Sequence, residues 1–227
     1  MGRFFDLESP FMRFLNLVGD LMILNFLVLI CCLPIFTAGA AFTGMHYVLL
    51  KVVRGEEGYL VRGFFKSFKQ NFRQATLIWL MMLVVIGIIG GDFLIFAYSD
   101  VEFPKAFIIF ILALAVLMLM VSVYIFPVLS RFDNTIKNTL KNAFYMAILN
   151  LPKTILMVLL LILPLVIVYF SAYAGIFVIM FGISLPAYLS AFLYSKIFKK
   201  FEPEAAAVVS DFEFTISTDE GNGEENG

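Results

Sequence analysis

Charged and polar residues are scarce in this chain of 227 residues, of which only 15% are Asp, Glu, Lys or Arg. Soluble domains carry about 25% charged residues. Hydrophobic residues make up 62% of the sequence, and the mean hydropathy is +0.97. This composition excludes an ordinary water-soluble globule and is typical of a polytopic helical membrane protein.

Cysteine, histidine and the common catalytic motifs are also nearly absent. The two cysteines, Cys31 and Cys32, are adjacent within an apolar run, which excludes a framework of loop-closing disulfides. There is no paired-histidine zinc helix, nucleophile elbow, phosphate-binding loop or dinucleotide fingerprint. His46 is the single histidine and has no further ligands nearby, so we predict no metal site and no cofactor. We expect a protein without enzymatic activity and without a nucleic-acid partner.

Long apolar runs predict the membrane spans. The first run, about 14–53, would form a helix of about 60 Å, which is twice the hydrocarbon thickness of a bilayer. Pro34 breaks this run, and Thr37 is a suitable cap for a second helix. The sequence therefore predicts an all-α bundle of six transmembrane helices, at about 14–33, 37–53, 76–98, 104–129, 154–171 and 175–198.

The basic residues predict the orientation. With both termini in the cytoplasm, fifteen of the sixteen Lys and Arg residues lie on the cytoplasmic side and only Lys105 lies outside. If the first run crosses once, five spans result and the split worsens to 13 against 3. We prefer six spans and keep five as the alternative.

Charge is distributed unevenly along the chain. Residues 1–200 carry a net charge of +7, whereas 201–227 carry eight acids and no base. We predict that the acidic tail at 201–227 is disordered and solvated. The alternative is that it folds back on the basic cytoplasmic face as a salt-sensitive lid.

The segment before the third span has the clearest pattern in the chain. Its Phe residues recur at helical spacing on one side, and basic residues lie on the other. Such an amphipathic interfacial helix is expected in the headgroup region, with its cations towards anionic lipid; docking of a partner protein is the alternative. The residues of this candidate partner or lipid surface are Arg62, Phe64, Phe65, Lys66, Phe68, Lys69, Phe72 and Arg73.

Polar residues inside the first predicted span are further candidates, because polar groups in a bilayer are costly. Asn16, Asp20 and, less closely, Asn25 share one side of that helix and are expected to face the bundle. We expect Asp20 to make a structural hydrogen bond or an ion pair with a residue such as Arg13, in preference to ion transport.

Three other features complete the predicted interior. Asp92 is expected to meet the outer headgroups, too far from Asp20 to share a proton as an intramembrane protease requires. His46 is expected to make a hydrogen bond in the core. Small residues favour close packing of the hairpin formed by the first two spans, through Pro34, Gly39 and Gly44.

Four segments resemble the YesL family of bacterial membrane proteins. They are residues 1–10, 31–35, 47–59 and above all 64–72, so the specific likeness covers roughly residues 1–80. That family is a domain of unknown function, often encoded beside carbohydrate uptake transporters and sugar-degrading enzymes. The resemblance implies a bacterial cell membrane and, as partners, permease subunits of a sugar transporter; it transfers no catalytic residues. The alternative is a small transporter or channel lined by Asn16, Asp20 and Asn25, and the oligomeric state stays open.

Overall fold

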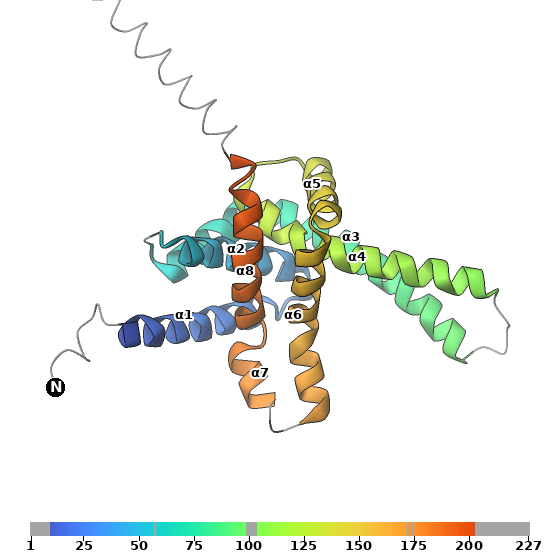
Figure 1. Ribbon diagram of the computed structural model, residues 1–227, viewed down its shortest axis with the longest axis horizontal. Coiled ribbons are helices and arrows are strands. Elements are labelled where there is room, and N and C mark those ends of the chain that lie inside the picture. Colours follow the sequence, from blue (N-terminus) through green and yellow to red (C-terminus); the bar gives the residue numbers. More distant parts are fainter. Residues whose placement is uncertain (1–9, 57, 99–103, 172, 174, 203–227) are drawn as a thin grey trace, which may run out of the picture.

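The computed structural model describes residues 10–56, 58–98, 104–171, 173 and 175–202, and all regular structure in these ranges is helical. Five helices are long and apolar enough to cross a membrane, or six if the bent pair α7 and α8 counts as one span. The predicted all-α, multi-pass class is confirmed (Figure 1). The helices are α1 (Pro10–Cys31), the 3-10 helix η1 (Ile35–Thr37), α2 (Ala38–Arg54), α3 (Leu60–Tyr98), α4 (Lys105–Arg131), α5 (Ile136–Leu149), α6 (Leu151–Phe170), α7 (Gly175–Phe181) and α8 (Ser184–Phe198).

Helix α3 is longer than any predicted span. The sequence separates an interfacial segment from a span that begins at Thr76, whereas the structure has a single helix of 39 residues. No proline interrupts this helix, and the Phe spacing continues into the apolar run. At 1.5 Å per residue the helix is about 58 Å long, roughly twice the hydrocarbon thickness. Its basic first turns therefore extend beyond the part that a bilayer covers.

The region predicted as one helix at 175–198 is bent by 49° between α7 and α8. At the bend the backbone N–H of Gly182 donates to the carbonyl of Val178 at 2.7 Å. A Cβ on Gly182 would overlap that same carbonyl, so this tight turn requires glycine. The structure thus replaces one continuous helix by two shorter ones.

Helix α2 lies at the centre of the fold and packs against α3, α4 and α8. Its small residues face α3: a Cβ on Gly39 would lie 2.7 Å from Cβ of Trp79, and one on Gly44 would lie 2.9 Å from the Phe64 carbonyl. The sequence assigned both glycines and Pro34 to the contact between α1 and α2. In the structure Gly39 and Gly44 serve the α2–α3 contact and Pro34 is exposed. Small residues permit close approach but do not specify which helix approaches.

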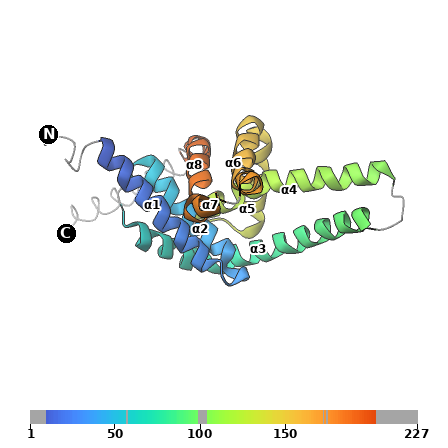
Figure 2. The same cartoon turned by 90° about the horizontal axis from the view of Figure 1, so that it is seen from below.

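The outer halves of α3 and α4 form a hairpin that stands apart from the body. We call residues 80–98 and 105–118 the α3–α4 arm. Figures 1 and 2 show the arm projecting away from α1 and α2, while α6 and α7 extend in another direction. Met82 and Ile89 are buried within the arm, but Ile88 is 60% exposed and Ile109 66% exposed. This apolar surface has to be covered by lipid or by another protein.

Candidate functional site

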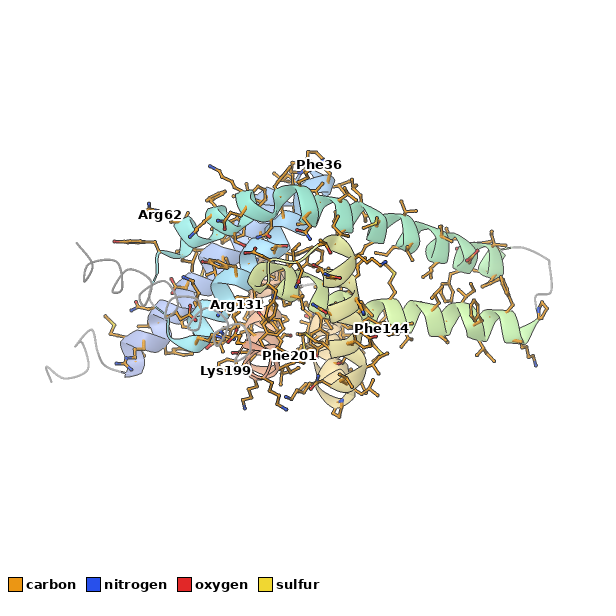
Figure 3. All side chains as sticks on the ribbon, turned by 90° about the horizontal axis from the view of Figure 1, so that it is seen from above. Phe36, Arg62, Arg131, Phe144, Lys199 and Phe201 are labelled. Carbon is orange, nitrogen blue, oxygen red and sulfur yellow. The ribbon has the colours of Figure 1, made fainter. Side chains whose placement is uncertain are left out.

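The first turns of α3 carry a row of exposed cations. Arg62, Lys66, Lys69 and Arg73 are all exposed and recur at intervals of three or four residues, which places them on one helix face. Phe65 is exposed on the same turns. Figure 3 shows this part of α3 along one side of the molecule, with Arg62 labelled. We call these four basic residues the cationic stripe.

The opposite side of the same turns is buried in protein. Phe64 is fully buried against α2 beside Gly44, and Phe68 and Phe72 are half-buried. Phe64 stacks on Phe68 with ring centroids 6.1 Å apart, and Phe68 contacts Phe72 at 5.5 Å. Phe64 therefore does not belong to the predicted partner or lipid surface. Because glycine leaves room for the ring, Phe64 is covered by α2 instead of lipid.

Asn25 is fully buried in α1 and bridges the break between α7 and α8. Its Oδ1 accepts hydrogen bonds from the backbone N–H groups of Ile183 and Ser184, each at 3.0 Å. Its Nδ2 donates to the carbonyl of Ile179 at 2.7 Å. One side-chain amide thus satisfies backbone groups from both ends of the broken helix, which an apolar environment leaves without other partners.

The other two members of the predicted polar stripe do not join Asn25. Asn16 is exposed, and Asp20 is half-buried in the wall of a surface cleft shared with α2 and α3. A step of five residues along a helix turns the side chain by about 140°, so Asp20 and Asn25 meet different neighbours. The predicted ion pair between Asp20 and Arg13 is not found among the described residues, where both ion pairs involve Glu202. The three polar residues form no common path.

His46 contacts the fully buried Tyr194 of α8. Its Nδ1 lies 3.2 Å from the Tyr194 hydroxyl, and the two rings meet edge to face with centroids 5.7 Å apart. Within the described ranges no three His, Cys, Asp or Glu side chains come together as a possible metal site. His46 therefore links α2 to α8 through the side chain of Tyr194.

Glu202 is the first acid of the predicted tail at 201–227 and connects three helix ends; residues 203–227 lie outside the described residues, so the prediction for the rest of the tail stays a prediction. Arg54, at the end of α2, donates from Nη1 to Oε2 of Glu202 at 3.0 Å, and its Nη2 lies 2.9 Å from Oε1. Arg131, at the end of α4, donates from Nε to Oε1 at 2.8 Å. Figure 3 shows Arg131 near the end of α8, where Lys199 and Phe201 are labelled. The detectable signal was one acid four residues after the end of α8 and one arginine at the end of each of two other predicted spans.

The surroundings of Glu202 determine its ionisation. Partial burial raises the pKa of this carboxyl, but hydrogen bonds from Arg54 and Arg131 and their positive charges outweigh burial and hold the pKa below its ordinary value of 4.5. A lowered pKa stabilises the fold above the unfolded pKa, and this contribution is lost as the pH falls through the folded value. We expect the unfolding free energy to decline in acid below about pH 4.5, as measured by detergent-denaturation curves at stepped pH.

Replacing Glu202 by glutamine is expected to remove the charge that Arg54 faces. Because the Arg54 side chain is only 8% exposed, the loss should lower the unfolding free energy by about 1–2 kcal/mol and flatten the acid dependence. The matched control is Glu56→Gln, since Glu56 is exposed at the α2–α3 turn and forms no ion pair with a described residue. Equal stability of the two variants would show that the contacts of Glu202 contribute nothing.

The α3–α4 arm carries a small-residue surface that was not predicted from the sequence. Gly87 and Gly91 are four residues apart on α3, and a Cβ on either one would meet no atom within 4 Å. Such G-x-x-x-G spacing lets a second helix approach closely in a membrane. Asp92 follows directly and is half-exposed. The spacing was visible in the sequence, but only the structure shows that no described residue packs against these two glycines.

One comparison with known proteins gave a match. Residues 21–93 match a family described as "Protein of unknown function, DUF624". The match spans α1 from Leu21, all of α2, and α3 as far as Phe93, and so includes Asn25, His46 and the cationic stripe. No curated protein and no solved structure matches the chain.

Proposed function

We propose that this chain is a non-enzymatic accessory or assembly partner of a carbohydrate uptake transporter in a bacterial cell membrane, with both termini in the cytoplasm. The match at 21–93 and the resemblance of residues 1–80 to the YesL family support the proposal. Members of that family are often encoded beside such transporters. The partners proposed are the permease subunits.

The observation that carries the proposal is the uncovered face of the α3–α4 arm. Permease subunits are themselves bundles of membrane helices, and helices associate in lipid through close packing of small residues. Helix α3 already occupies the space beside Gly39 and Gly44, whereas a Cβ on Gly87 or Gly91 would meet no atom within 4 Å. The arm thus presents a helix-docking surface that the described part of the chain does not use.

Co-purification tests this proposal. The protein would be extracted from its native membrane in a mild detergent through an N-terminal tag, and the recovered proteins identified by mass spectrometry. We expect permease subunits in stoichiometric amounts, and a loss of about tenfold in their recovery with the double variant Gly87→Leu/Gly91→Leu, because a blocked small-residue face costs at least 1.4 kcal/mol.

The matched control is Gly19→Leu. Gly19 lies in α1, and a Cβ there also meets no atom within 4 Å, so the variant adds one leucine side chain at a different open helix face. Recovery should stay within about twofold of the unmodified chain. An equal loss of permease recovery in the control and the double variant would contradict docking at the arm. So would purification of the unmodified protein without any permease subunit.

The bent pair α7 and α8 favours a second candidate, a small transporter or channel. Discontinuous helices often mark substrate sites in transporters. The test is uptake of a panel of radiolabelled mono- and disaccharides into proteoliposomes that contain only this protein. Substrate-dependent uptake would favour transport, and absence of uptake would remove this candidate.

A further inference from the structure

A cleft of about 200 Å³ opens between the middle of α1, the end of α2 and the start of α3. Its basic lining consists of Lys51 from α2 and Arg62 and Lys66 from the cationic stripe. Three cations thus converge from two helices. The cleft lies at the α2–α3 turn, where the candidate span Ile35–Arg54 ends. If this span crosses a bilayer, its end lies near the lipid phosphate groups.

These three cations have no carboxylate partner among the described residues. Both ion pairs among the described residues involve Glu202, which binds Arg54 and Arg131. Lys51 is instead held by an aromatic ring, with its Nζ 5.2 Å from the ring centroid of Tyr47. The basic groups of the cleft are therefore available to an anion.

The rest of the lining sets the size and character of that anion. Asp20 and Glu56 also line the cleft, so its net charge is about +1 and a highly charged polyanion is disfavoured. Val48, Val52 and Leu60 supply an apolar wall, and Tyr59 adds an aromatic edge. A singly charged phosphate diester with an attached apolar chain suits this mixture of groups better than a free inorganic ion.

We propose that the cleft binds the phosphate group of an anionic phospholipid, with Lys51, Arg62 and Lys66 as its ligands. The apolar wall then contacts the glycerol and the first acyl carbons of the lipid. The site is separate from the α3–α4 arm and does not depend on the function proposed above. Charge-assisted hydrogen bonds from lysine and arginine to phosphate oxygens are among the stronger polar contacts available.

Native mass spectrometry of the full chain in a neutral detergent tests the site. The probes are dihexanoyl-phosphatidylglycerol, the zwitterionic dihexanoyl-phosphatidylcholine, and inorganic phosphate. We expect one phosphatidylglycerol per chain, bound about tenfold more weakly by Arg62→Gln/Lys66→Gln, since two charge-assisted contacts are lost. Both side chains are exposed, so the variant should keep its fold; the emission of Trp79, the only tryptophan, checks this.

The matched control is Lys69→Gln/Arg73→Gln, which removes the same charge from the same stripe outside the cleft. Its affinity should stay within about twofold of the unmodified chain. Equal weakening by the two double variants would mean diffuse attraction to the stripe and overturn the site. Equal binding of both lipids, or displacement of phosphatidylglycerol by inorganic phosphate at matched concentration, would overturn the anionic lipid as the occupant.

Discussion

Replacing Asn25 by alanine is expected to lower the free energy of unfolding by about 2–4 kcal/mol, because three backbone groups at the α7–α8 break lose their hydrogen-bond partner together. The amide accepts from Ile183 and Ser184 and donates to the Ile179 carbonyl, at 2.7–3.0 Å. A single hydrogen bond between membrane helices contributes less, about 0.6 kcal/mol on average. The larger value here follows from the α7–α8 break, where the backbone supplies no substitute partner within the helix.

Unfolding of the purified protein in mixed micelles, with rising amounts of denaturing detergent, measures this effect. Asn16→Ala is the control, because Asn16 is on the same helix but exposed, and its replacement should change the unfolding free energy by less than about 0.5 kcal/mol. If Asn25→Ala changes the unfolding free energy as little as Asn16→Ala does, Asn25 does not stabilise the broken helix.

The second large effect is expected from Gly39→Ala. The added Cβ would lie 2.5 Å from the carbonyl oxygen of Ala75 and 2.7 Å from Cβ of Trp79, so α2 and α3 must separate. Overpacking of this kind costs about 1–3 kcal/mol. The separation should also disturb the hydrogen bond that Trp79 Nε1 donates to the Ile35 carbonyl at 2.8 Å.

Tryptophan fluorescence provides a direct measurement, because Trp79 is the only tryptophan in the chain. We expect Gly39→Ala to shift the emission maximum and to lower the detergent midpoint. Gly87→Ala is the control on α3, where a Cβ meets no atom within 4 Å, and it should leave both unchanged. Unchanged emission in Gly39→Ala would contradict the close contact of α2 and α3.

Apolar run length was sufficient to predict the helical class and the number of possible spans, because a bilayer sets a minimum length for each crossing. It could not predict that α3 is continuous from Leu60, since a helix that leaves the bilayer keeps the same period. It also could not show which helix fills the space at Gly39. Such pairings depend on three-dimensional neighbours that one sequence does not encode locally.

The candidate sites were also predictable only in part from the sequence. Composition identified Asp20, Asn25 and the cationic stripe as unusual, because polar groups near apolar spans are costly. The partners of polar residues were not predictable from the sequence. Asn25 binds α7 and α8 more than 150 residues away, and Glu202 binds Arg54 at a separation of 148 residues. Phe64 was misassigned because a periodic pattern shows that a face is apolar, but not whether lipid or protein covers it.

Photo-crosslinking from the α3–α4 arm tests the proposed partnership in native membranes. A photoreactive residue at Ile88, which is 60% exposed, should form a cross-link to a permease subunit of a sugar transporter, identified by mass spectrometry. The same residue at Phe14, which is 61% exposed on α1, should not form that cross-link. Cross-links from Ile88 to lipid alone, or the same products from both positions, would contradict a docking function for the arm.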